Sequence, residues 1–218
     1  MGLLTLVDFR DEIDVTFGER SLDTPHYDRW INFAYLDICT AVDFDILDAE
    51  LSFNTADGTR NYNAPTTPYI SIKHVRDTSS DYSLAWIPKE DFFRLTAADE
   101  GAPKRWTLHL DDIYLYPCPD GIYAVKAIYK QTPTILSEDG DVTVLQAGWD
   151  AAVTMLAVHY GYMALGEEQR AVVWYNRAIS YIQSRMTEGG LQKGTPGLLP
   201  AFHAGGNYGA ANAQGLQG

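Results

Sequence analysis

Histidines are the first side chains of this chain to consider for chemistry. The five histidines are His26, His74, His109, His159 and His203, and none has a histidine four residues away. That spacing would place two metal ligands on one face of a helix. His159 lies among apolar residues in a helical pattern, which favours a satisfied core or interface side chain over a general base. The histidine pattern therefore predicts neither a metal site nor histidine-centred catalysis.

Paired carboxylates are the second candidate. Asp111 and Asp112 adjoin His109, but adjacent residues of a strand point to opposite faces, so a turn is the better interpretation. Glu90 and Asp91 fall in the first turn of a short predicted helix, where the helix dipole accounts for them. The chain contains no G-x-S-x-G, P-loop or dinucleotide-binding motif. We expect no catalytic residue, no cofactor and no enzymatic activity.

Composition and charge narrow the remaining classes. Sixteen basic and 29 acidic residues give a net charge of −13, which argues against binding nucleic acid or an anionic membrane by electrostatics. A channel wall that repels DNA remains compatible with this charge. Cys39 and Cys118 form no C-x-x-C or Cys/His pattern, so neither a zinc site nor a disulfide framework is expected. No apolar run approaches the roughly 20 residues that span a bilayer, and the N-terminus does not resemble a signal peptide.

Helical patterns occupy both ends of the chain. Thr5 and Asp8 are placed as a capping box for a helix from Leu6 to Phe17, which Gly18 ends. Thr24-Pro25 begins a second helix that runs to about Val42. Its predicted buried stripe comprises Trp30, Ile31, Phe33, Ala34, Tyr35, Ile38 and Val42. The short loop between the two predicts an antiparallel αα-hairpin.

Two further helices are predicted near the C-terminus, over about 144–165 and 167–187, with a break at Gly166. The first has a predicted buried stripe of Leu145, Trp149, Ala152, Val153, Leu156, Tyr160 and Met163. The stripe of the second comprises Val172, Tyr175, Ala178, Ile179 and Ile182. A one-residue break again predicts a hairpin of helices.

The intervening segment alternates with a period of two, which is typical of strands. Strands are predicted over 49–53, 59–63 (as a return strand), 69–75 and 82–87, followed by a short helix from Pro88 to Leu95. Three more, over 106–110, 113–116 and 122–129, are predicted to form an antiparallel meander, with dense turn chemistry at Pro117-Cys118-Pro119-Asp120-Gly121.

These elements predict an α+β fold, in which a helical bundle of two αα-hairpins carries an inserted antiparallel β subdomain and an extended C-terminal tail. The predicted parts are an N-terminal hairpin (1–43), the β insertion (44–136), a C-terminal hairpin that packs with the first (137–190) and the tail (191–218). The tail is rich in glycine and shows no period. Two interpretations of the tail have equal weight: a disordered segment, and a segment that docks on a partner through spaced apolar residues. The candidate docking residues are Leu198, Leu199, Phe202 and Tyr208.

Three segments stand out within this order of elements: TPHYDRWINFAYLDI with its Trp-Ile-Asn early in the second helix, GAPKRWTLHLDDIYLYPCPDGIYAVKAIYKQTPTIL, and the Trp-led helix GWDAAVTMLAVHYGYMALGE. With these segments, the order of elements resembles the head-to-tail adaptor (connector) proteins of tailed bacteriophages. The resemblance covers roughly Leu4 to Met186.

The resemblance implies a structural virion protein. Such adaptors assemble as a dodecameric ring under the portal, extend the DNA channel without specific DNA binding, and attach tail or neck proteins. It also implies that the C-terminal tail docks on the portal. The expected location is the virion neck, after synthesis in the host cytoplasm, with no membrane contact.

Two other classes stay open from the residues alone. A small glycan hydrolase of the virion would need two convergent carboxylates. A glycan-binding module would present strand tyrosines such as Tyr114, Tyr116 and Tyr123, although strand tyrosines are more often cross-strand packing pairs.

Overall fold

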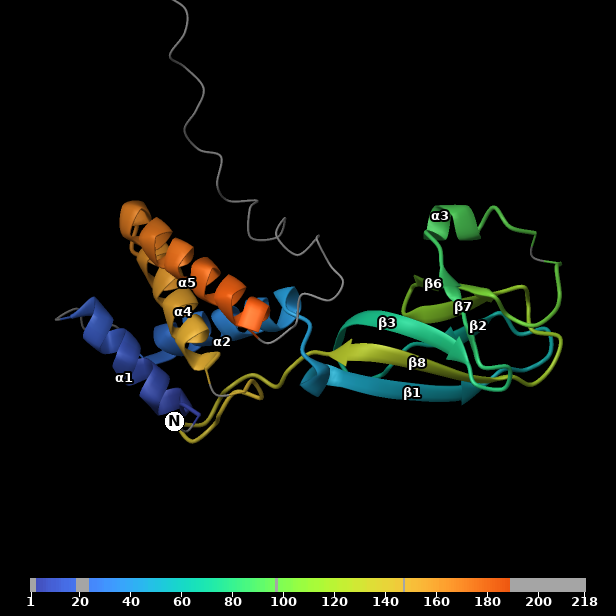
Figure 1. Cartoon of the computed structure of the whole chain (residues 1–218), viewed down its shortest axis with the longest axis horizontal. Coiled ribbons are helices and arrows are strands. Elements are labelled where there is room, and N and C mark those ends of the chain that lie inside the picture. The colour runs from blue at the N-terminus through green and yellow to red at the C-terminus, as the bar shows by residue number, and fades with distance from the viewer. Residues whose placement is uncertain (1–2, 19–23, 97, 147, 189–218) are drawn as a thin grey trace, which may run out of the picture. The chain divides into compact units, whose positions relative to one another are not determined.

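The structure is a computed structural model that describes residues 3–18, 24–96, 98–146 and 148–188. The chain divides into two compact units, which are described separately (Figure 1). The helical unit comprises Met1–Asp43 and Ile135–Gly218, and the sheet unit comprises Phe44–Thr134.

The helical unit begins with α1 (Leu6–Phe17), as the capping box predicts. The backbone N–H of Thr5 donates to the Asp8 carboxylate at 2.9 Å, and the Asp8 N–H donates back to the Thr5 hydroxyl at 3.3 Å. The helix ends at Gly18, whose φ of 72° suits a residue without a side chain. The buried residues follow spacings of three and four: Leu6, Phe9, Ile13 and Phe17.

Helix α4 (Asp150–Ala164) is the centre of this unit. It packs against α1, against α2 (Thr24–Ala41) and against α5 (Glu168–Glu188). The packing of N-terminal against C-terminal helices is confirmed (Figure 1). Because α4 has neighbours on several sides, its buried residues spread around much of the helix and include Ala157, Val158 and Gly161.

The predicted start of α4 near residue 144 is wrong. Residues before Asp150 are held by contacts with other segments: Val142 bridges Thr5, and the Val144 N–H donates to the Tyr35 hydroxyl at 3.1 Å. These nonlocal bonds replace helical ones. Three residues assigned to buried stripes are instead exposed because the contacts between helices are narrower than the apolar patterns: Phe33, Met163 and Val172.

The sheet unit contains two four-stranded sheets. The first has the order β1-β8-β3-β4, built from β1 (Asp48–Asn54), β8 (Ala124–Gln131), β3 (Tyr69–Asp77) and β4 (Tyr82–Ser83). The second has the order β2-β7-β6-β5, built from β2 (Asn61–Asn63), β7 (Asp112–Tyr116), β6 (Arg105–His109) and β5 (Ala85–Trp86). A 3-10 turn (η1, Asp45–Leu47) precedes β1, and the short helix α3 (Lys89–Phe92) follows β5.

The predicted three-stranded meander is wrong in its third strand. Only β6 and β7 form an antiparallel hairpin, and β8 joins the other sheet between β1 and β3. Likewise β2 is not the return strand of β1, since it pairs with β7. The predicted strand over 82–87 is divided: β4 pairs with β3, whereas β5 pairs with β6 in parallel.

Both sheets contribute to one core, which explains why the chain changes sheet so often. Val75, Val125 and Ala127 come from the first sheet, and Trp106, Ile113 and Leu115 come from the second. Leu84, at the crossing between β4 and β5, is buried in the same core. At this crossing Leu84 supplies the buried apolar surface, whereas β4 and β5 on either side of it are exposed.

Candidate assembly surface

The segments that carry the resemblance are structural, and two of them meet. Asn32, from the Trp-Ile-Asn of α2, donates through Nδ2 to the Leu136 carbonyl at 2.9 Å and accepts the Leu136 N–H at 2.8 Å. Leu136 ends the Pro-Thr-Ile-Leu run that returns from the sheet unit. One side chain on α2 thus fixes the point at which the chain re-enters the helical unit.

The Pro-Cys-Pro-Asp-Gly run forms the corner between β7 and β8. The Thr55 hydroxyl donates to the Gly121 carbonyl and accepts the Tyr123 N–H, both at 2.8 Å. The Tyr116–Pro117 peptide bond is cis. The corner carries the chain from one sheet to the other, so its turn residues have a structural explanation.

Among the residues that the structure describes, the histidine and carboxylates considered above have structural contacts. His159 is half-buried and its Nδ1 lies 2.9 Å from the Ala171 carbonyl, so it links α4 to the start of α5. Burial lowers the pKa of His159. Asp111 lies in the hairpin turn, and Asp112 accepts a hydrogen bond from Asn61 at 2.9 Å.

In the part of the chain that the structure describes, no group of three or more His, Cys, Asp or Glu residues is arranged to hold a metal ion. Over the same ranges, each helix is too short or too polar to cross a bilayer.

The strand tyrosines take part in packing and hydrogen bonds. Tyr114 packs edge-on against Phe92 and Phe93, with ring centroids 6.2 and 5.6 Å apart. The hydroxyls of Tyr116 and Tyr123 donate to Asp99 and Asp120 respectively. These contacts are with α3 and with loops rather than across strands, and they favour a structural role over a glycan platform.

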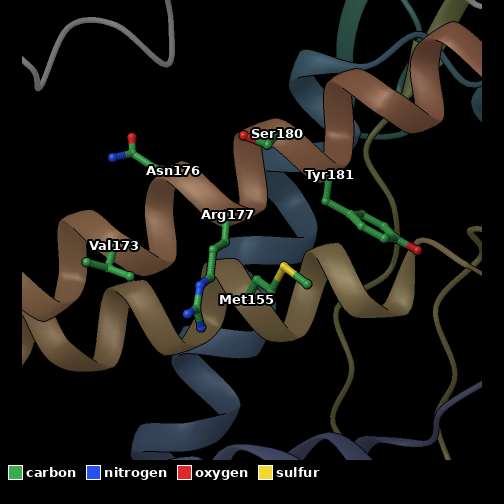
Figure 2. A pocket seen from close by; sticks show the side chains of 6 residues that line it. All are labelled: Met155, Val173, Asn176, Arg177, Ser180 and Tyr181. Carbon is green, nitrogen blue, oxygen red and sulfur yellow. The ribbon is translucent and has the colours of Figure 1, made fainter.

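An open groove of about 650 Å³ runs between α4 and α5 (Figure 2). Met155 of α4 lies opposite Val173 and Arg177 of α5, and Tyr181 closes one end. The Arg177 guanidinium lies 4.9 Å from the ring centre of Trp174, so a positive charge is held beside apolar side chains. The helical stripes did not predict this groove. Its signal in the sequence is a set of apolar or aromatic residues outside the predicted stripes: Met155, Val173 and Tyr181.

Loop tips of the sheet unit expose further apolar residues. Leu110 is 81% exposed at the tip of the β6–β7 hairpin, and Ile122 is 79% exposed beside the Asp-Gly corner. Leu110 and Asp111 have φ of 49° and 60°, a two-residue turn with both residues in the left-handed region. The predicted turn at Asp111-Asp112 is therefore shifted by one residue.

The predicted docking residues Leu198, Leu199, Phe202 and Tyr208 lie outside the described residues. They begin ten residues after the end of α5 at Glu188.

The comparison with protein families decides what kind of protein this is. A family model described as SU10 adaptor protein matches residues 4–197. The chain belongs to the SU10 adaptor protein family. No curated protein matches the sequence.

This adaptor is a structural head–tail protein of a phage virion, as the resemblance implies. The family match includes Asn32, the Pro-Cys-Pro-Asp-Gly corner and the α4/α5 groove. It ends one residue before Leu198, so membership in the family does not bear on the four predicted docking residues.

Proposed function

We propose that copies of this adaptor form a closed ring, a dodecamer by the resemblance stated above, that lies under the portal, extends the DNA channel and attaches tail or neck proteins. The observation that carries the proposal is the family match over residues 4–197. A ring of identical copies needs head-to-tail contacts between two different surfaces of each subunit. Four packed helices give a rigid body that can repeat in this way.

The C-terminal tail is the proposed portal-binding segment. Leu198, Leu199, Phe202 and Tyr208 are separated by small and polar residues, the arrangement of apolar anchors in a chain that binds along a groove or a sheet edge. A segment of this kind can order on binding and wrap a partner surface.

The net charge of −13 suits a channel through which DNA moves. An acidic lumen repels the phosphate backbone, so the DNA does not adhere to the wall during packaging or ejection. We expect no measurable binding of duplex DNA at physiological salt.

The central experiment mixes the purified adaptor with portal rings and images the product by negative-stain electron microscopy. A second ring stacked coaxially on the portal is the expected result. Portal rings that remain bare at saturating adaptor concentration would contradict the proposed function.

The tail is tested by three variants. Deletion of Leu191–Gly218 and replacement of the four anchors by serine are each expected to abolish co-sedimentation with portal rings, while far-ultraviolet circular dichroism stays unchanged. A control deletion of residues 209–218, beyond the last anchor, is expected to retain binding. Full retention of binding by the serine variant would refute the role of the anchors.

The proposal also implies that the C-terminal tail becomes ordered when it binds the portal. Cleavage by a protease of broad specificity is expected at sites after Leu191 in the free adaptor and to be suppressed in the portal complex. Equal cleavage rates in the two states would contradict ordering on binding.

A further inference from the structure

We propose that the groove between α4 and α5 receives α1 of a neighbouring copy, and that this contact joins subunits around the ring. The inference deepens the proposed ring, on which it rests. Its occupant is a second copy of this chain, presented through a stripe on α1 that comprises Val7, Asp11 and Val15.

The groove has a mixed lining with one cation, Arg177, beside the apolar or aromatic Met155, Val173 and Tyr181 and the polar Asn176 and Ser180. Met155 and Tyr181 line it from below and from one end, and Val173 remains 49% exposed on its rim (Figure 2). Arg177 lies one helical turn after Val173, so the two side chains share a face of α5. The Trp174 ring beside the guanidinium limits its freedom to turn away. The groove therefore fits a helix that carries apolar residues next to a carboxylate.

Helix α1 offers a surface of that kind. Val7 and Val15 are 40% and 83% exposed, and Asp11 lies between them at spacings of four residues. These three residues form one stripe, on the side away from buried Phe9 and Ile13. Val15 is β-branched and 83% exposed, so the described residues of the subunit bury little of its side chain.

The other carboxylates of α1 have partners within the same subunit. Asp8 completes the capping box with Thr5. Glu12 accepts the Thr154 hydroxyl at 3.0 Å, and Asp14 accepts the Tyr27 hydroxyl at 2.8 Å. Asp11 is exposed, and it is the carboxylate flanked by the two exposed valines.

The two surfaces match in spacing and in charge. Each places a valine four residues from a charged residue: Val7 before Asp11, and Val173 before Arg177. A helix seated between α4 and α5 would cover Val173 and Met155 with valine side chains and bring the Asp11 carboxylate to the Arg177 guanidinium. The surfaces differ from each other, which is the condition for a ring rather than a two-fold dimer.

Charge exchange tests this contact. Arg177→Glu and Asp11→Arg are each expected to raise the concentration for half-maximal self-association by more than about tenfold, because each places like charges together. Recovery is expected in the double variant and in an equimolar mixture of the two single variants, since both restore opposite charges across the contact. Arg94→Glu, an exposed charge reversal in the sheet unit, is the control that should assemble like the wild type.

Self-association is measured by mass photometry over a concentration series, and as ring occupancy on portal rings by electron microscopy. Circular dichroism at 222 nm verifies that each variant is folded. Single variants that assemble like the wild type, or a double variant as weak as the singles, would overturn the contact while the ring itself still stands. A wild type that forms no ring, alone or on portal, would instead overturn the proposed function and this inference with it.

A cross-linking measurement is independent of charge. Val7→Cys and Val173→Cys in the same chain are expected to give a ladder of covalent oligomers on mild oxidation of the assembled protein, because each copy would be linked to two neighbours. Each single cysteine variant should stay monomeric on a denaturing gel, since Cys39 and Cys118 are buried. Absence of the ladder in assembled rings would refute the assigned surfaces.

Discussion

Gly161 of α4 lies against side chains of α1 and α2, and its replacement by alanine tests that packing. A Cβ at this position would overlap Cζ of Phe17 and lie 2.9 Å from Cζ3 of Trp30. Phe17 is the last residue of α1 and Trp30 belongs to α2. The alanine methyl group would therefore overlap rings from both helices that cover this part of α4.

The expected loss follows from two opposing effects. Overpacking of a filled core costs about 1–3 kcal/mol, and three ring atoms within 3.0 Å of the new carbon place this site near the upper end. In the opposite direction, the higher helix propensity of alanine stabilises the helix by about 1 kcal/mol relative to glycine. We expect Gly161→Ala to lower the free energy of unfolding by about 2 kcal/mol, or the melting temperature by about 6 °C.

The ring of Phe17 is unable to move aside freely. It packs in tilted geometry against Tyr162 at a centroid distance of 4.7 Å and against Trp30 at 5.8 Å. Phe17→Leu would remove the atoms nearest to the new methyl group. The double variant should therefore be more stable than the sum of the single effects allows, by at least about 1 kcal/mol.

The assay is thermal unfolding followed at 222 nm, because the four long helices all belong to the helical unit. Gln183→Ala and Gln183→Gly, at an exposed position of α5, calibrate the helix propensity of alanine against glycine. If Gly161→Ala stabilises the protein by the amount that this pair gives, or if the double variant is simply additive, the close approach of α1 and α2 to α4 is refuted.

Three further predictions concern contacts that hold each unit together. Asn32→Ala should lower the free energy of unfolding of the helical unit by about 2–3 kcal/mol, because the Asn32 side chain no longer pairs with the N–H and the carbonyl of Leu136. A loss below about 0.5 kcal/mol in urea unfolding would contradict this. Burial raises the pKa of Asp150, so the folded state holds that proton more tightly than the unfolded state, and the stability this provides at acid pH is lost as pH rises through the raised value. The melting temperature of Asp150→Asn minus that of the wild type should therefore increase from pH 4 to pH 7, and a difference that falls over this range would contradict this. Leu110→Asn should stabilise the β6–β7 hairpin by about 1 kcal/mol, because asparagine tolerates positive φ better than leucine; unchanged or faster amide exchange of the two strands would oppose it.

Local sequence was sufficient for the helix ends that carry a capping residue, a proline or a glycine, but not for the start of α4. Thr5, Asp8 and Gly18 lie within a few residues of the helix ends that they determine, and α1 begins and ends where they predict. Thr24-Pro25 and Gly166 likewise marked helix ends to within about two residues. Capping and backbone freedom act over one helical turn, so an isolated sequence contains all the information that they need.

The pairing of strands was outside the reach of local sequence. The alternation of β8 identified a strand, but two partners were equally compatible with it: the neighbouring β7 and the distant β1 and β3. The choice depends on the core, where Val125 and Ala127 of β8 pack with residues of both sheets. The period of two specifies faces rather than partners, so adjacency along the chain was the wrong guide.

The residues of this adaptor thus determined where helices and strands lie, and the order of those elements indicated its family before any contact was known. The tertiary structure alone decided which apolar side chains remain exposed. Val173 and Phe33 are apolar like their buried neighbours on the same helices. They are exposed because the contact between helices is too narrow to cover them. The surfaces available for assembly consist of side chains that stay exposed after the subunit has packed its own core. Which side chains stay exposed depends on contacts between segments far apart in the sequence.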